Sequence, residues 1–584
     1  MSDFRRPTPG LTFPFLLFTF EIMDNAAIAD NFSLLSKLMD IHGENSFKTK
    51  TYSIAAYHIE QLPGPLKDTP RDKLFTIKGI GDSIGKKVIE MLDTGQLAVL
   101  NEYLEKTPAG VIELLNIKGI GPKKIHTIWK EMGIESPGEL LYACNENRLT
   151  LYKGFGEKTQ INIQEAIEFF LSNQGSFLYA QIEVLFPQVD GYLKKLFGSD
   201  KVRVTGAYRR QESIIDELEF IIMADNNSIK PKFQTAQPPE LLEETENSIL
   251  YKLKNGVKLR FYTGVKNRAE QLFITTGNKE FVESFQQAYP GLKYKGDESE
   301  EDEIIFEKAK IKYIPPYLRE SETVIEKAKA NKLPVVLQVS DIKSIIHNHS
   351  NWSDGTNTIE EMANECIKRG YEYFVISDHS KSAFYAKGLS EERIREQHKY
   401  IDELNKKLKP FKIFKSIECD ILNDGSMDYT DDILATFDLV IASVHSNLKM
   451  TEEKAMTRVL RAISNPYVTI LGHMTGRLLL SRNGYPLDHK KVIDTCIANS
   501  VVIELNAHPR RLDIDWKWIE YATRNGGIIS INPDAHFLEG FDDVKYGVLS
   551  AQKGGLTKEQ NLSSYSLKQF EDFLQKRKVL KSLA

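Results

Sequence analysis

Between positions 345 and 536, short apolar runs are repeatedly followed by a histidine, an aspartate or a glutamate. Nine of the twelve histidines of the chain lie in this region, between His347 and His536. Apolar strands that alternate with helical stretches predict a layered or barrel-shaped α/β domain from Lys343 onward. Because the carboxyl ends of such strands converge on one mouth, we expect the polar side chains to lie close together there.

The ligand pattern is densest at its start, in Ile345-Ile346-His347-Asn348-His349-Ser350. In a strand, residues i and i+2 point to the same face, so His347 and His349 can bind one ion side by side. Imidazoles and carboxylates suit Mn²⁺ and Zn²⁺, and the sequence does not choose between them. Clustered ions of this kind activate water and hold the oxygens of a phosphate ester. The pattern therefore predicts a metal-dependent phosphoesterase.

These motifs resemble those of the PHP (polymerase and histidinol phosphatase) superfamily, a distorted (βα)7 barrel that holds up to three Mn²⁺ or Zn²⁺ ions. The resemblance covers residues 341–575 and implies nine metal ligands, all of them present: His347, His349, Asp354, His379, Glu418, His445, His473, Asp534 and His536. It also implies that Glu418 bridges the ions and that Glu418, Asp534 and His379 are the catalytic residues. Arg477 and Arg482, just after His473, are either ligands of a substrate phosphate or ordinary surface arginines.

The first third of the chain repeats a glycine turn, as Ile77-Lys78-Gly79-Ile80-Gly81, Ile117-Lys118-Gly119-Ile120-Gly121 and Tyr152-Lys153-Gly154-Phe155-Gly156. An internal repeat of this kind predicts a helical array. The turns resemble helix-hairpin-helix motifs, in which backbone N–H groups at a helix start contact a DNA phosphate and lysines assist. The alternative is plain packing of helices. The resemblance implies DNA contacts, independent of base sequence, by Gly79, Gly81, Gly119, Gly121, Lys123, Gly154 and Gly156.

The middle of the chain changes to shorter, β-like runs. Clusters of β-branched residues predict strands at 202–204, 218–223 and 257–262. The acidic run at 297–303 is expected to be a solvated loop.

The order of these regions resembles the bacterial family X DNA polymerases that carry a C-terminal PHP domain. The clearest mark is Gly206-Ala207-Tyr208-Arg209-Arg210, close to the Gly-Ser-Tyr-Arg-Arg nucleotide-binding turn of that family. The resemblance implies a multidomain chain with an α-helical helix-hairpin-helix region, an α+β nucleotidyltransferase-like palm and thumb, and a C-terminal α/β barrel. The expected domains are residues 23–95 (helix-hairpin-helix), 96–175 (fingers-like), 176–265 (palm), 266–321 (thumb), 322–340 (linker) and 341–575 (PHP).

The polymerase site departs from the family pattern. Glu217 and Glu219 replace two aspartates, and Lys258 replaces a third. Nucleotidyl transfer by two metals needs carboxylates that hold Mg²⁺ tightly, and an ammonium group repels the ions. We therefore expect a degenerate site, marked by Gly206, Arg209 and these three residues, with no Mg²⁺ at the palm and with polymerase activity lost or weak.

The predicted function is that of a DNA-repair enzyme acting on gapped, nicked or 3′-ended duplex DNA. The PHP resemblance implies 3′→5′ exonuclease, abasic-site endonuclease or 3′-phosphatase activity and does not rank them. The alternatives are an active gap-filling polymerase with proofreading, a small-molecule phosphatase and a DNA-binding scaffold without activity.

Composition sets broad limits only. Four scattered cysteines form no CxxC pair, which is typical of a reducing cytosol, and the net charge of −5 leaves DNA binding to local motifs. Residues 1–22 contain an apolar run like that of a targeting segment, but Pro14 and Glu21 interrupt it. We expect those residues to be a disordered or mis-assigned extension. The expected protein is a cytoplasmic, nucleoid-associated monomer without a membrane segment.

Overall fold

The computed structural model describes residues 24–62, 64–146, 148–233, 238–292 and 300–583. The expectation for residues 1–22 therefore lies outside the described residues. The chain divides near Gly175 into two compact units, and each is described by itself. In the described part of the chain, no helix is both long and apolar enough to cross a membrane.

The first unit is built of helices around one apolar core. Between α1 and α2, Phe32 stacks on Tyr52 with ring centroids 5.9 Å apart. The helices are α1 (Asn25–Ile41), α2 (Ser46–Glu60), α3 (Asp82–Thr94), α4 (Ala98–Lys106), α5 (Ala109–Glu113), α6 (Pro122–His126), α7 (Pro137–Asn145) and α8 (Glu157–Ser172). This part of the fold agrees with the predicted helical array.

The three glycine turns share one geometry. The first glycine of each turn is left-handed, with φ of +87° at Gly79, +89° at Gly119 and +92° at Gly154. A residue with a Cβ is strained in this region, so glycine is needed there. The second glycine precedes α3, α6 or α8 as its N-cap, and the residue between the two glycines is buried. The repeat therefore presents the amino ends of three helices in the same way.

The second unit begins with a mixed sheet of order β2-β4-β7-β6-β5. Strands β4 and β7 are parallel, and the remaining neighbours are antiparallel. The strands are β2 (Val202–Thr205), β4 (Leu218–Ile222), β5 (Glu240–Thr245), β6 (Ser248–Lys252) and β7 (Lys258–Tyr262). The three predicted strands correspond to β2, β4 and β7. The sequence reading missed β5, whose exposed and acidic residues lack the pattern of a half-buried strand.

Helices follow the sheet and enclose a second, phenylalanine-rich core. Phe273, Phe285 and Phe306 meet there with ring centroids 4.7 to 5.6 Å apart. The elements of this region are α9 (Tyr179–Phe197), α10 (Gly206–Arg209), α11 (Asn226–Ile229), α12 (Arg268–Thr276), α13 (Lys279–Ala288), α14 (Glu303–Lys308) and α15 (Thr323–Lys329), with the short pair β1 (Phe177–Leu178) and β3 (Ile214–Ile215).

The expectation of a solvated acidic loop is wrong for the described end of that run. Asp302 is fully buried and pairs with Arg209 at 2.7 Å and with Arg319 at 2.5 Å. Burial opposes the charge of Asp302, but the two guanidinium groups outweigh it and hold the pKa of Asp302 below its ordinary value. Glu301 also pairs with Arg203, at 2.7 Å. Arginines from other segments pair with these acids, and local composition could not reveal them.

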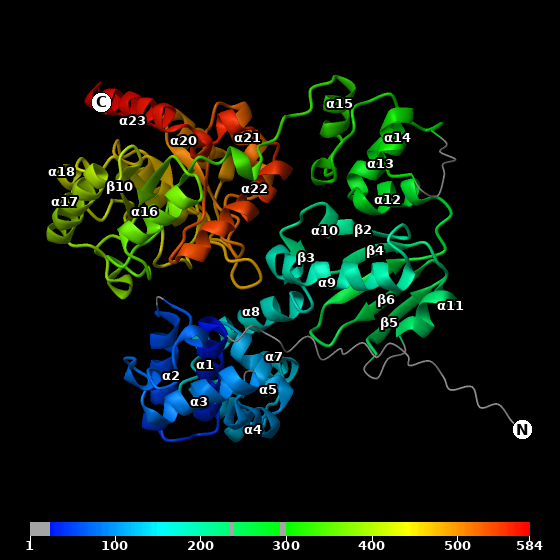
Figure 1. Ribbon diagram of the computed structural model, residues 1–584, viewed down its shortest axis with the longest axis horizontal. Coiled ribbons are helices and arrows are strands. Elements are labelled where there is room, and N and C mark those ends of the chain that lie inside the picture. Colours follow the sequence, from blue (N-terminus) through cyan, green and yellow to red (C-terminus); the bar gives the residue numbers. More distant parts are fainter. Residues whose placement is uncertain (1–23, 63, 147, 234–237, 293–299, 584) are drawn as a thin grey trace, which may run out of the picture. The chain divides into compact units, whose positions relative to one another are not determined.

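The C-terminal part of the second unit is a parallel seven-stranded sheet of order β14-β13-β12-β11-β10-β9-β8 that nearly closes into a barrel (Figure 1). The bridge between Asn348 and Ala535 joins its two edges, and the His349 N–H donates to the Ala535 carbonyl at 2.8 Å. The strands are β8 (Ser344–Ile345), β9 (Tyr373–Ile376), β10 (Lys412–Asp420), β11 (Leu439–Ser443), β12 (Ile470–Leu471), β13 (Val502–Asn506) and β14 (Ile529–Asn532). The predicted distorted barrel is confirmed.

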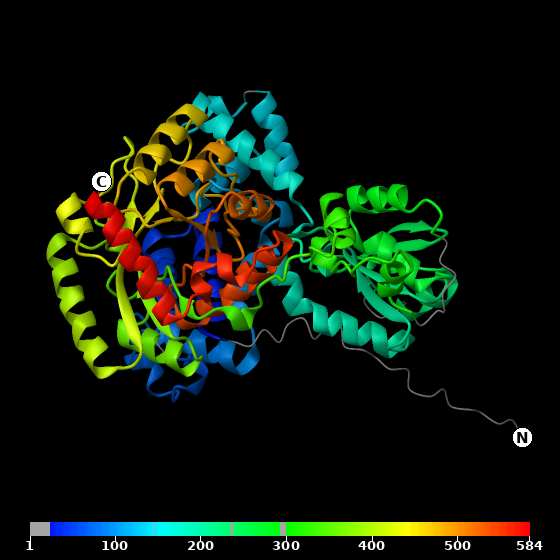
Figure 2. The same ribbon diagram turned by 90° about the horizontal axis from the view of Figure 1, so that it is seen from above.

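Successive residues of the barrel strands point alternately into two different apolar layers. In β11, Leu439 and Ile441 join the inner layer, while Val440 and Ala442 pack under the surrounding helices. Helix α23, red in Figure 2, contributes Phe570 to the inner layer. The helices are α16 (Ile359–Lys368), α17 (Glu391–Lys407), α18 (Asp431–Leu434), α19 (Glu452–Ile463), α20 (His489–Ala498), α21 (Ile519–Arg524), α22 (Val544–Lys553) and α23 (Leu567–Leu583).

A buried lysine links the barrel to the preceding region within this second unit. The side chain of Lys553, at the end of α22, is fully buried. Its ammonium group pairs with Glu320 at 2.5 Å and with Glu212 at 3.2 Å, and it donates to the Arg210 carbonyl at 2.9 Å. A buried ammonium persists only when carboxylates and carbonyls replace its water, as they do here.

Candidate metal centre

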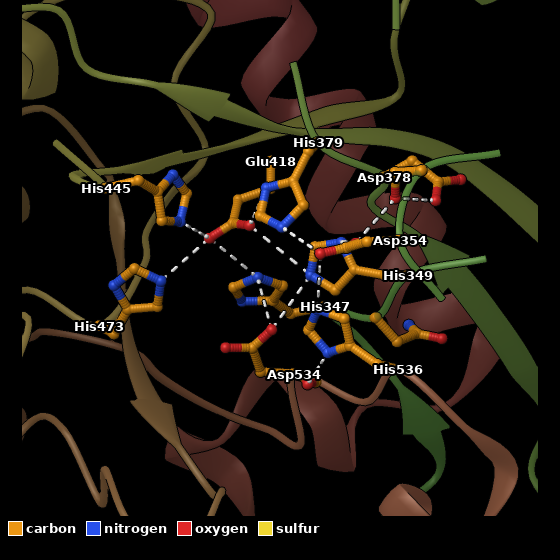
Figure 3. Close-up of polar contacts among 12 residues, drawn as sticks. His347, His349, Asp354, Asp378, His379, Glu418, His445, His473, Asp534 and His536 are labelled. Carbon is orange, nitrogen blue, oxygen red and sulfur yellow. Dashed lines mark hydrogen bonds and ion pairs between the residues drawn. The ribbon is translucent and has the colours of Figure 1, made fainter. Parts of the chain in front are cut away.

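The residues predicted as metal ligands lie at the carboxyl ends of the barrel strands and point toward one another (Figure 3). Glu418 lies within β10. Several of the others follow their strand by two residues: His347 after β8, His445 after β11, His473 after β12 and Asp534 after β14. His347 and Asp534 adopt positive φ values of 59° and 54°. Such strained conformations occur where a tightly packed site imposes them.

Glu418 is at the centre of the cluster. Its Oε1 lies 3.1 Å from His347 Nε2, 3.1 Å from His445 Nε2 and 3.0 Å from His473 Nε2. Its Oε2 lies 3.0 Å from His379 Nδ1. One carboxylate thus contacts imidazoles from four different strand ends.

The ligand atoms form three overlapping groups, and within each group all of them lie within 4.8 Å of one another. The groups are His349 with Asp354, His379 and His536; His347 with His349 and Asp534; and His379 with Glu418 and His445. His349 and His379 each belong to two groups. This spacing could hold several ions side by side. Eight of the nine predicted ligands belong to these groups, and the ninth, His473, lies 3.0 Å from Glu418 Oε1.

Several buried polar atoms of the cluster make no well-aligned hydrogen bond with the described residues, although His347 Nε2 and His379 Nδ1 lie 3.1 Å and 3.0 Å from Glu418 oxygens. They are His347 Nε2, His349 Nδ1, His379 Nδ1, Glu418 Oε2 and His473 Nδ1. A buried polar atom left unsatisfied costs about 1–3 kcal/mol. Cations in the centre would satisfy such atoms, so the residues fit a group of divalent ions.

Other buried acids orient the ligands. Glu504 Oε1 lies 2.5 Å from His347 Nδ1, and its second oxygen accepts from the His473 backbone N–H at 2.6 Å. Asp420 Oδ1 lies 2.5 Å from His445 Nδ1. Such partners fix the ring and tautomer of a ligating histidine. The sequence reading missed both acids, although Glu504 ends an apolar run as the predicted ligands do.

Residues of the cluster shift one another's pKa values. Burial opposes the charge of Glu418, but His445 and His347 outweigh it and hold the pKa of Glu418 well below its ordinary value. Burial likewise opposes the charge of His445, yet Glu418 and Asp420 raise its pKa to about 10. Burial, His379 and His536 lower the pKa of His349 to about 3. These shifts favour the ionised form of Glu418, and cations would compete with protons for His445.

The two arginines predicted to hold a phosphate are occupied by the protein itself. Arg477 pairs with Asp515 at 2.6 Å and donates to the carbonyl of Arg511 at 2.9 Å. Arg482 donates to the carbonyl of Gly476 at 2.7 Å. Their role as phosphate ligands stays a prediction. The sequence reading did not single out Arg511, whose Nε lies 3.6 Å from Asp534 Oδ2 at the metal centre.

Comparison with known proteins agrees with this architecture. Three family models match: a helix-hairpin-helix domain at residues 23–97, a SAM-like helix-hairpin-helix tandem at 111–168 and a PHP domain at 346–508. The DNA polymerase/3′-5′ exonuclease PolX of Bacillus subtilis is 32% identical over 566 residues, which cover 92% of this chain and 97% of that protein. The chain belongs to the PolX family. The predicted family resemblance is confirmed.

Other relatives match only part of this chain. A probable phosphatase of Acetivibrio thermocellus is 31% identical over 158 residues, 26% of this chain and 59% of that protein. A probable phosphatase of Syntrophotalea carbinolica is 26% identical over 243 residues, 39% of this chain and 94% of that protein.

In this chain, the carboxylates predicted to form a degenerate polymerase site accept hydrogen bonds from neighbouring residues. Glu217 accepts two hydrogen bonds from the guanidinium of Arg260, one of them at 3.1 Å. Glu219 accepts from the Tyr262 hydroxyl at 2.8 Å and from the Ala207 N–H at 3.1 Å. Burial raises the pKa of Glu219. Both carboxylates thus accept hydrogen bonds from neighbouring residues, and the absence of Mg²⁺ at the palm stays a prediction.

The other marks of the polymerase-type site are similarly engaged. Gly206 packs so closely on the Glu219 carboxylate that a Cβ there would come within 1.8 Å of its oxygen. Arg209 donates to Asp302 and, at 2.6 Å, to the Thr276 hydroxyl. Lys258 opens β7, on the strand next to the two glutamates.

Proposed function

We propose that the PHP centre hydrolyses phosphate esters of DNA, as a 3′→5′ exonuclease, abasic-site endonuclease or 3′-phosphatase, in DNA repair. The observation that carries the proposal is the set of three overlapping ligand groups around Glu418. We further propose a cytoplasmic monomer that acts on gapped, nicked or 3′-ended duplexes.

Each part of the centre has a role in this proposal. The nine cluster residues hold the ions, and bound Mn²⁺ or Zn²⁺ would activate water and neutralise a phosphate ester. Glu504 and Asp420 keep the rings of His347 and His445 oriented. Arg511, beside Asp534, supplies a positive charge for a phosphate oxygen.

The helix-hairpin-helix turns hold the DNA backbone in this proposal. Apart from Gly121 and its two neighbours in the chain, no described residue has an atom within 4 Å of the position of a Cβ on Gly121, and its φ is an ordinary −84°. Gly121→Val should therefore fold normally but block a phosphate from the helix start. Losing one charge-assisted contact weakens DNA binding by about 10-fold. Unchanged affinity in a titration of fluorescent duplex would remove this turn from the DNA surface.

Polymerase activity is lost or severely weakened in this proposal. The glutamates accept hydrogen bonds from Arg260, Tyr262 and Ala207. Lys258 adds a positive charge at the start of β7, the strand that pairs with β4. Two-metal transfer requires carboxylates that are free to bind the ions.

One assay tests both halves of the proposal. A 5′-labelled primer in a gapped duplex is incubated with Mn²⁺, with and without deoxynucleotides. Shortening in both conditions without extension supports the proposal, and template-directed extension would overturn the loss of polymerase activity. The chain with His347→Ala and His349→Ala serves as the control for contaminating nucleases.

The relatives named as probable phosphatases favour a second candidate, hydrolysis of a terminal phosphate monoester. Release of inorganic phosphate from a 3′-phosphorylated strand, faster than shortening of the matching 3′-hydroxyl strand, would identify a 3′-phosphatase. The opposite ranking would identify an exonuclease.

A further inference from the structure

Two adjacent aromatic side chains are exposed beside the metal centre. Phe384 is 84% exposed and Tyr385 is 65% exposed, in the short helical turn between the end of β9 and α17. Their rings are nearly perpendicular, with centroids 6.3 Å apart, and the Tyr385 ring lies 6.4 Å from the ring of His379. An exposed aromatic pair this close to a ligand is not explained by packing of the core.

The loop that carries the pair is held in place by its own hydrogen bonds. The Ala383 N–H donates to the Ser380 carbonyl at 3.0 Å, and the Gly388 N–H donates to the Ala383 carbonyl at 3.1 Å. Arg393 of α17 donates to the Lys387 carbonyl at 2.6 Å. The two rings are thus exposed on an ordered loop.

A pocket of about 520 Å³ opens beside the rings. Phe384 and Tyr385 line it together with Ser382, Asp420 and Asn423. Asp420 also orients the metal ligand His445, so the pocket adjoins the centre. Its volume falls in the range of about 300–1,000 Å³ that is typical of small-ligand sites.

The chemistry of the pocket suits a nucleobase better than a phosphate. A base offers a π-face to one ring and an edge to the other, and its polar groups can bond to Asn423 and Ser382. The carboxylates of Asp420 and Asp424 repel a second phosphate. A strand whose reacting phosphate lies at the metal centre would place its terminal base within reach of the rings.

We propose that Phe384 and Tyr385 stack on the base of the 3′-terminal nucleotide of the DNA strand being hydrolysed. The pair would then make the centre prefer a nucleotide end over an end without a base. This inference rests on the proposed DNA hydrolysis. Stacking on an aromatic side chain is worth about 1–3 kcal/mol per base, roughly a 5- to 150-fold effect.

The test compares two strands that differ only at the 3′ end, one with a terminal 2-aminopurine nucleotide and one with a terminal abasic nucleotide. The variant Phe384→Leu with Tyr385→Leu keeps apolar bulk and removes both rings. The matched control, Phe384→Tyr with Tyr385→Phe, keeps both rings. We expect the ratio of kcat/KM between the two strands to fall about 10-fold in the leucine variant and to persist in the control. An unchanged ratio in the leucine variant would overturn the inference.

A binding readout separates this inference from the proposed function. With a phosphorothioate at the terminal linkage to slow hydrolysis, stacking of 2-aminopurine on the rings quenches its fluorescence when the intact chain binds. Quenching that needs the rings, in a chain that never hydrolyses DNA, would support base stacking and contradict the proposed function. Hydrolysis with quenching that survives the leucine variant would contradict base stacking alone.

Discussion

In the second unit, the PHP centre and the palm differ in how far the polar atoms of their side chains are satisfied by hydrogen bonds. In the PHP centre, atoms of His347, His349 and Glu418 are buried without a well-aligned hydrogen bond to the described residues. In the palm, Glu217 and Glu219 are bonded to neighbouring side chains. In the sequence, both centres contain a group of acidic side chains, and the acidic residues alone do not tell the two centres apart. Unsatisfied buried atoms fit a centre that takes up cations, whereas the palm glutamates already accept hydrogen bonds from the protein.

The largest effect should come from removing ligands of the PHP centre. His347→Ala with His349→Ala should lower DNA hydrolysis by more than about 100-fold, because losing even a residue that only orients a metal-ligating histidine costs about 10–100-fold. DNA affinity should remain nearly intact, since the turns of the first unit are unchanged. Rates on the labelled primer and a binding titration check both points. His489→Ala, which removes a ring stacked on Trp518 and its hydrogen bond with the Leu487 carbonyl, is the matched control. Retained hydrolysis in the double variant would refute the site assignment.

The polymerase-like side of the comparison is tested by Asp302, the buried acid of the thumb that pairs with Arg209 of the palm. Asp302→Asn should lower the free energy of unfolding by about 3–5 kcal/mol, because it leaves Arg209 and Arg319 without their carboxylate. Urea titration measures this loss. Asp572→Asn, in an exposed pair with Lys568, should cost no more than about 1 kcal/mol. Equal losses would mean that the palm ion pairs are not structural.

The pH dependence of the same loss follows from the lowered pKa of Asp302. A carboxylate with a folded pKa below its unfolded value stabilises the fold above the unfolded pKa, about 3.9. That contribution is lost as the pH falls through the folded pKa. The difference between the intact chain and Asp302→Asn should therefore be constant from about pH 5 to 7 and shrink below about pH 4.

Metal-induced stabilisation should come from one centre only. Mn²⁺ at 100 times its dissociation constant should raise the free energy of unfolding by about 2.7 kcal/mol. The double histidine variant should lose this gain, and Glu217→Gln with Glu219→Gln should keep it. Melting curves with and without Mn²⁺ measure both. A gain that disappears in the glutamine variant would show that the palm still binds cations and would break the comparison.

The smallest expected effect concerns the contact of Lys123 with a DNA phosphate. Lys123→Gln should reduce the slope of log affinity against log salt by about 1, because one phosphate contact is lost. Metal-dependent stabilisation should not change. Lys568→Gln, on exposed α23, is the control. An unaltered slope for Lys123→Gln would place that lysine away from the DNA.

Features repeated locally along the chain could be predicted, and partners fixed by the tertiary fold could not. The glycine turns and the histidines after β8 and β11 carry their pattern within a few residues. The partner of Glu217 lies 43 residues away, and that of Arg209 lies 93 residues away, so no local pattern reveals either pair. Glu504 was within reach of sequence reasoning, since it and Asn506 repeat the i, i+2 spacing of His347 and His349.

Lys553 bears on how this gene could evolve. Its buried ammonium in the PHP barrel depends on Glu212 and Glu320 from the polymerase-like region. Replacing Glu212 and Glu320 while Lys553 stays buried would leave its ammonium without the carboxylates that balance it. Substitutions at these two glutamates would therefore be selected against for the sake of the barrel, whatever chemistry their own region performs.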